Sequence, residues 1–163
     1  SAKYTKIEES QIDDLTKLKS GDYLLSSLQN KNQFKIYLGT PAIFNNGWYP
    51  DFLKVEGDNL VGEVDGLRFK LISASVNKPI TVSGWDVVNK RPRPLVKAVP
   101  AGSVYHFELL DNVFDEEKIT KIKANYHFRI LTGNYLTDSA NIPQNELVKY
   151  GKAGFGLALV GKI

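Results

Sequence analysis

The sequence predicts an α+β protein in which a mainly antiparallel β-sheet carries packed helices. The first observation is a pair of strand-like runs on either side of Asp65-Gly66, a dipeptide typical of two-residue hairpin turns. The second is the segment 115–124, where acids come first and lysines later, as the helix dipole favours. The third is the apolar run 157–160, which predicts a closing strand. Strands and helices without regular alternation favour the α+β class.

The N-terminal part of the chain predicts one helix and two strands before a loop. Residues 10–18 have helical spacing of apolar side chains, and Ser10 is expected to cap this helix. Residues 23–28 and 34–38 are rich in strand formers and are expected to be strands. Two prolines make residues 40–51 a loop.

The hairpin around Asp65-Gly66 is expected to join strands 60–64 and 67–76, with a further strand at 80–82. In the strand 67–76, alternate side chains should share one face of the sheet. That face is expected to carry Leu67, Phe69, Leu71 and Ser73.

Residues 84–94 predict an irregular loop, because two prolines so close together do not fit a central strand or a helix. The strand pattern resumes over 96–110. Residues 126–131 fit either an extension of the preceding helix or a strand. Residues 143–149 predict a short helix that starts with a proline.

Length and composition predict one domain spanning 1–163. The chain has 163 residues, with 42% hydrophobic and 24% charged residues, and it contains no internal repeat or linker. No apolar run reaches the roughly 18 residues that a membrane span needs. The sequence has no cysteine, which excludes disulfides, thiolate metal sites and thiol nucleophiles, and which fits a cytoplasmic protein. A net charge of +3 is by itself weak evidence for nucleic-acid binding.

A proline-rich loop concentrates positive charge. Lys90, Arg91, Arg93 and Lys97 are clustered there, and Asp86 is the only acid between residues 84 and 97. Such side chains suit backbone phosphates, which arginine binds in a forked geometry. The loop is therefore a candidate RNA-binding site, and a solvated surface loop is the alternative.

A glycine-rich segment precedes the closing strand. Gly151, Gly154 and Gly156 lie there together with Lys152. Glycines let backbone N–H groups approach a phosphate or another chain closely. The spacing of a phosphate-binding P-loop is absent, and a dinucleotide fingerprint would need the opposite order of strand and helix. The segment is a candidate RNA contact, and a tight helix-to-strand turn is the alternative.

Two tryptophans, Trp48 and Trp85, each follow a glycine. An exposed indole could stack on an RNA base. Packing in the core, or burial against a neighbouring subunit, is the favoured interpretation, because large aromatic side chains dominate cores and interfaces.

Catalysis finds little support in the sequence. The chain has two histidines, His106 and His127, and neither belongs to a metal-binding pattern. We therefore expect no metal, no cofactor and no catalytic residue. A general-base role for His106 is the alternative.

Four segments, taken in order, resemble the C-terminal half of one protein family, the third subunit (RAMP superfamily) of type III-B CRISPR Cmr RNA-guided complexes. They are Thr40-Pro41-Ala42-Ile43-Phe44 with Gly47-Trp48-Tyr49-Pro50; Ser83-Gly84-Trp85-Asp86; Val99-Pro100-Ala101-Gly102-Ser103-Val104-Tyr105; and Gly154-Phe155-Gly156-Leu157-Ala158-Leu159-Val160-Gly161. The resemblance covers residues 38–163, and residues 1–33 carry no recognised motif. Since family members are longer, we expect an N-terminal portion to be missing.

The resemblance implies a ferredoxin-like or RRM-like antiparallel sheet with packed helices and insertions, and a glycine-rich loop before the last strand. It implies a non-catalytic, cytoplasmic subunit that binds guide (CRISPR) RNA near its 5′ tag. Its protein partners would be the large polymerase-like Cmr subunit and neighbouring RAMP backbone subunits, with no membrane. A RAMP-type endoribonuclease that processes guide-RNA precursors and a purely structural interaction module stay open as alternatives.

Overall fold

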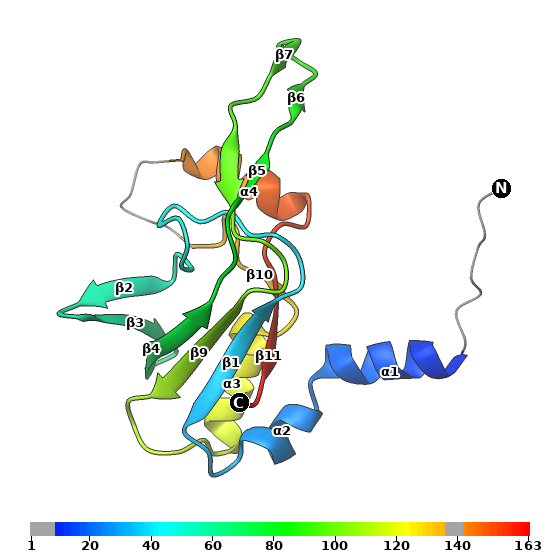
Figure 1. The fold of residues 1–163 in the computed structure, drawn as a ribbon. Coiled ribbons are helices and arrows are strands. Elements are labelled where there is room, and N and C mark those ends of the chain that lie inside the picture. The colour runs from blue at the N-terminus through cyan, green and yellow to red at the C-terminus, as the bar shows by residue number, and fades with distance from the viewer. Residues whose placement is uncertain (1–8, 136–141) are drawn as a thin grey trace.

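The computed structural model describes residues 9–135 and 142–163. Within them, seven strands form one antiparallel sheet in the order β10-β11-β1-β9-β4-β3-β2, which confirms the α+β prediction with an antiparallel sheet (Figure 1). The first eight residues of the motif-free stretch 1–33 lie outside the described part. The strands are β1 (Gln33–Leu38), β2 (Leu53–Glu56), β3 (Asn59–Val64), β4 (Leu67–Ser75), β9 (Val104–Leu109), β10 (Arg129–Ile130) and β11 (Leu157–Gly161).

The predicted hairpin joins β3 to β4. Asp65 and Gly66 both have positive φ, at 48° and 77°, as the favoured two-residue turn requires. One part of the prediction is wrong, because the pairing of β4 with β9 shifts between Leu71 and Ser73. A bulge adds one residue and moves all later side chains to the opposite face. Ser73 therefore lies beside His106 and does not share the face of Leu71.

Helices differ from the predictions at the N-terminal end. Residues 23–28, expected to be a strand, form a helix in which Leu24 and Leu28 are buried one turn apart. Ser10 lies within the first helix, one residue after its described start at Glu9, so the predicted start differs by one residue. The ambiguous segment 126–131 divides, with Tyr126 ending a helix before a short strand begins. The helices are α1 (Glu9–Ser20), α2 (Tyr23–Leu28), α3 (Glu116–Tyr126) and α4 (Gln144–Lys152).

The main core lies between the sheet and the helices α2 and α3. Phe34 stacks on Phe107 with ring centroids 5.1 Å apart, and the edge of Phe69 meets both rings. Tyr126 of α3 adds its buried ring to the cluster. Rings of this size remove the largest apolar areas from water, so they dominate the stability of the core.

A long hairpin arm, residues 76–103, connects β4 to β9 and stands away from the sheet (Figure 1). In it, β5 (Ile80–Val82) pairs with β8 (Val96–Ala98), and β6 (Trp85–Asp86) pairs with β7 (Arg91–Pro92). The prediction of an irregular loop at 84–94 is thus wrong in part. A two-stranded ribbon tolerates Pro92, because its outer edge needs no backbone donor.

Helix α4 packs beside the base of the arm. A second, smaller apolar cluster holds it there, with Leu147 and Tyr150 from the helix and Ile43 and Ala98 from the loop and β8. All four side chains are at most 8% exposed. This contact fixes the position of α4 relative to the arm and so shapes the space between them.

Candidate nucleic-acid interface

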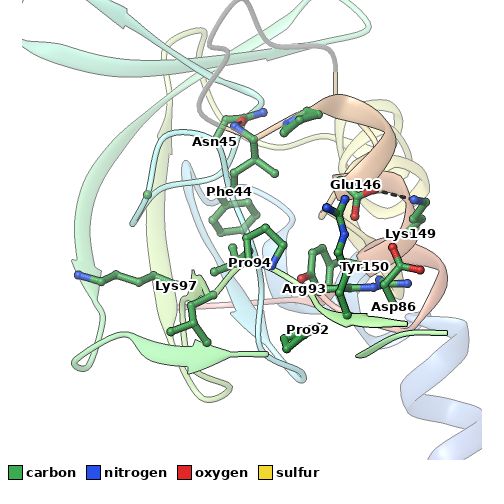
Figure 2. A pocket seen from close by; sticks show the side chains of 16 residues that line it. Phe44, Asn45, Asp86, Pro92, Arg93, Pro94, Lys97, Glu146, Lys149 and Tyr150 are labelled. Atoms are coloured by element: carbon green, nitrogen blue, oxygen red, sulfur yellow. Dashed lines mark hydrogen bonds and ion pairs between the residues drawn. The ribbon is translucent and has the colours of Figure 1, made fainter. Parts of the chain in front are cut away.

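A cleft of about 640 Å³ lies between the hairpin arm and α4. Figure 2 shows side chains from both elements lining this one hollow. The arm contributes Arg91, Arg93 and Lys97, and α4 contributes Glu146 and Lys149. Three of the four cations predicted in the basic loop therefore line one cavity.

Apolar side chains line other parts of the cleft. Tyr150 belongs to the smaller cluster, Phe44 to the main core, and Pro94 comes from the arm (Figure 2). Asn45, which is buried, accepts a hydrogen bond at Oδ1 from the backbone N–H of Ile142. The hollow thus combines three cations of the arm with apolar side chains, and two acids, Asp86 and Glu146, also line it.

The cations of the arm form no ion pair in the described residues, although Arg93 lies close enough to Asp86 to help lower the pKa of that carboxyl. Lys90, Arg91, Arg93 and Lys97 make no ion pair within residues 9–135 and 142–163. Lys149, by contrast, binds Glu146 with 2.6 Å between Nζ and Oε1. The arm holds five of the 21 lysine and arginine residues of the chain but only one of its 18 acids. Its positive charge is therefore available to an anionic ligand.

The one acid of the arm organises the tip. The carboxylate of Asp86 accepts hydrogen bonds from the backbone N–H groups of Val88 and Asn89 and from the side-chain amide of Asn89. The hydrogen bond from the Asn89 side chain is the largest cause of the lowered pKa of Asp86. The tip is held as a defined turn, with Lys90 at a φ of 49°. Asp86 thus orders the segment that carries the cations.

The glycine-rich segment uses its backbone donors inside the chain. The N–H of Gly154 binds the carbonyl of Gly151, and the N–H of Gly156 binds the carbonyl of Pro41. The hydroxyl of Thr40 accepts a hydrogen bond from the backbone N–H of Leu157 and donates one to the carbonyl of Gly154. No backbone donor from 153 to 157 is left for a phosphate, so the reason for expecting phosphate there does not hold.

Two of the three glycines have packing roles. A Cβ atom on Gly151 would lie 2.3 Å from the carbonyl oxygen of Thr132, and one on Gly156 would lie 2.6 Å from the Thr132 hydroxyl. Gly154 has open space around it. Lys152 lines a different hollow, beside Arg129, so the structure does not bring it into the cleft with the arm. Contact of this segment with RNA stays a prediction.

Both tryptophans are on the surface. Trp48 is 47% exposed and Trp85 is 58% exposed, so packing in the core of this chain is wrong for both. Trp85 lies in β6 of the arm, opposite Pro92. Burial against a neighbouring subunit stays a prediction.

The histidines do not line the cleft. His127 is 5% exposed, and Val160 N donates to its Nδ1, so Nε2 carries the hydrogen and donates to Leu18 O at 2.7 Å. Burial lowers the pKa of His127, which fits this neutral, structural ring. His106 lies within hydrogen-bond distance of Ser73, with 2.9 Å between Nδ1 and Oγ.

Two absences apply to the described ranges only. They contain no group of three or more acids and histidines placed to hold a metal ion. In the same ranges, no helix is long and apolar enough to cross a membrane.

The sequence did not predict that Lys149 and Tyr150 line the cleft, because no local pattern shows that α4 lies beside the arm.

Comparison with known proteins identifies one family. Residues 7–163 match the family model described as CRISPR-associated protein (Cas_Cmr3). No curated protein matches the chain significantly.

Proposed function

We propose, for a chain that belongs to the CRISPR-associated Cmr3 family, that it binds guide RNA through the hairpin arm and serves in assembly of the type III-B Cmr complex. Membership of the family supports a role as a subunit of that complex. One observation carries the RNA-binding role: four cations that form no ion pair in the described residues lie on an arm that stands clear of the sheet (Figure 1).

Phosphates are the ligand that this surface suits best. A guanidinium binds two phosphate oxygens through parallel N–H groups, and Arg91 and Arg93 offer two such groups at the cleft. Contacts of this kind position an RNA strand without reading its bases. We therefore infer that the arm tracks the sugar–phosphate backbone of the guide and tolerates any sequence there.

We propose that the subunit lies near the 5′ tag of the guide, beside the large polymerase-like subunit and neighbouring RAMP backbone subunits, in the cytoplasm. We also propose that it does not cleave RNA, since His127 has both ring nitrogens engaged and His106 lies outside the cleft. Precursor cleavage that His106→Ala abolishes would instead support the endoribonuclease alternative.

We propose that the central sheet is a variant of the ferredoxin-like arrangement. Strands β11, β1, β9 and β4 lie side by side in that order. Because β1 is antiparallel to both β9 and β11, those two strands are parallel to each other, and α3 lies in the connection between them. This matches the second half of a split βαβ arrangement. We propose that the segment from β1 to β4, with its loop and the β2–β3 hairpin, takes the place of the first helix.

The test is a salt titration of guide-RNA binding to the assembled complex. Changing Arg91 and Arg93 together to Ala should weaken binding to a similar extent for any tag sequence. It should also reduce the slope of log affinity against log salt concentration by about 1.4, because each lost single-strand phosphate contact removes about 0.7.

The matched control changes Lys31 and Lys54 together to Ala. Both are exposed cations outside the arm, so the loss of net charge is the same. This control should leave the slope close to that of the unaltered complex. If the double arginine variant keeps its affinity and its slope, the arm does not bind RNA, and a purely structural role becomes the better explanation.

A further inference from the structure

A second hollow, of about 600 Å³, lies at the base of the hairpin arm and has no assigned ligand. Its lining is largely apolar and contains no acid. Its lining includes Trp48, Val76, Asn77, Pro79, Lys97 and Val99. We call this hollow the Trp48 pocket.

The backbone of Trp48 is anchored, and its 47% exposed indole has a ring contact on one side. The hydroxyl of Tyr105, which is fully buried, donates a hydrogen bond to the backbone carbonyl of Trp48. The ring of Tyr49 meets the indole edge-on, with centroids 5.2 Å apart. An exposed aromatic ring on an anchored backbone has little freedom to lose on binding, so it is suited to be a stacking platform.

The Trp48 pocket adjoins the cleft that carries the basic residues of the arm. Gly47 and Lys97 line both hollows. A ligand can therefore extend from the cleft past Lys97 to the indole, and the lining of the Trp48 pocket adds no acid. The ammonium of Lys97 has no acidic partner in the described residues.

From this geometry we propose that the Trp48 pocket receives one unpaired nucleobase of the RNA strand held by the arm. The base stacks on the face of Trp48, the apolar side chains of Val76 and Val99 exclude water, and Lys97 neutralises an adjoining phosphate. Asn77 offers an amide to the edge of the base. This inference rests on the proposed function, since the arm delivers the strand. An aromatic platform with cationic surroundings is how proteins hold single-stranded nucleic acid without strict sequence preference.

The first test uses the fact that the chain has only two tryptophans. Trp85→Phe leaves Trp48 as the single reporter, and Trp48→Phe leaves Trp85. Adding a single-stranded RNA oligonucleotide to the full chain should quench the emission of Trp48. A matched oligonucleotide with abasic sites keeps the phosphates but lacks bases, so it should bind without that quenching. Equal quenching by both oligonucleotides, or none with either, would overturn the proposal.

The second test measures affinity. Trp48→Ala should weaken binding of the normal oligonucleotide about tenfold, within the range for loss of one stacked base. It should not change binding of the abasic oligonucleotide. Tyr37→Ala is the matched control, because Tyr37 is an aromatic residue of β1, outside the arm, and is 42% exposed. It lines neither the cleft nor the Trp48 pocket, so it should change neither affinity.

The two proposals fail in different ways. If Trp48→Ala changes nothing while the double arginine variant still weakens binding, the base pocket is refuted and the arm as RNA site stands. If the double arginine variant changes nothing either, both proposals fall. Loss of a neighbouring subunit from the complex of the Trp48→Ala variant, at unchanged RNA affinity, would show that the pocket binds protein and would overturn the nucleobase assignment.

Discussion

At the scale of single residues, burial of the Asp51 carboxylate lowers the stability of this fold. Its side chain is 6% exposed, and Oδ1 accepts a hydrogen bond from the backbone N–H of Asn46 at 3.3 Å, whereas Oδ2 has no partner in the described structure. Burial disfavours the charged carboxylate and raises the pKa of Asp51 from 3.8 to about 6. The folded chain therefore binds a proton more tightly here than the unfolded chain does.

The sign of the pH effect follows from linkage. Between pH 3.8 and about 6 the folded state holds more protons at Asp51, so the stability contributed by this residue falls as the pH rises. Above pH 6 the full cost is present. We expect Asp51→Asn to raise the free energy of unfolding by about 1 kcal/mol at pH 7.5, since the gain from removing the charge exceeds the cost of burying an amide. Urea unfolding at pH 7.5 and 4 measures this.

The two pH values supply the control for that substitution. At pH 4 the carboxyl is already neutral in the folded chain, so the advantage of Asn should largely disappear. If Asp51→Asn gives the same change at both pH values, the effect does not come from the charge, and the assigned pKa shift is wrong.

At the scale of elements, the turn from α4 into β11 sets apart two glycines that the sequence presents as equivalent. Gly154 and Gly156 have φ of 91° and 85°, so alanine is strained at either position. Only Gly156 faces a neighbour, with a Cβ atom 2.7 Å from the backbone nitrogen of Thr132. We expect Gly154→Ala to cost about 1 kcal/mol and Gly156→Ala about 3 kcal/mol or more of unfolding free energy, by urea denaturation.

The matched positions make the outcome informative. Equal losses in the two variants would mean that backbone strain alone matters and that Thr132 can move aside. RNA affinity of the folded Gly154→Ala protein should stay unchanged, because the donors of this segment are already bound within the chain. A strong loss of affinity in that variant would support the prediction that the glycine-rich segment contacts RNA directly.

The sequence predicts an element well where a local signal specifies it. The Asp65-Gly66 turn, the acid-first helix capped by Asp115 and the closing strand β11 were all predictable, because each has its own turn, cap or apolar pattern. Residues 23–28 were not, since six residues with three leucines fit a strand as well as a helix. The packing of Leu24 and Leu28 against the core decides the question.

The candidate site likewise contains residues that the sequence predicts and residues that it does not. Charge clustering alone was enough to propose Arg91 and Arg93, since cations in a loop with one acid rarely all find partners. The part played by Lys149 and Tyr150 depends on a contact between α4 and the arm, which are about fifty residues apart in sequence. Such non-local contacts leave no periodic signal. The sequence also does not predict that the backbone donors of the glycine-rich segment are occupied, because Thr40 and Pro41, which accept hydrogen bonds from two of them, are far away in the chain.

At the scale of the whole molecule, the outer part of the hairpin arm (residues 83–95) contributes little to the stability of the rest of the fold. The main apolar core contains no side chain from residues 80–98. The small cluster under α4 includes Val82, Val96 and Ala98 at the base of the arm, and nothing farther out. Residues 83–95 thus contribute charge and shape while contributing little burial. The fold can then carry this segment without depending on it.

A shortened arm tests that separation. Val82 and Val96 are direct partners across the ribbon, so Asn-Gly in place of residues 83–95 should close the hairpin with a two-residue turn. Because the replaced segment lies outside both apolar clusters, the free energy of unfolding should change by less than about 1 kcal/mol.

The shortened arm should also bind RNA differently. The change removes Lys90, Arg91 and Arg93, so the slope of log RNA affinity against log salt should fall by about 2. Lys97 and the Trp48 pocket remain, so weak, base-dependent binding should persist. A loss of several kcal/mol in stability would show that the arm belongs to the folding unit, and an unchanged salt slope would show that its cations do not meet RNA.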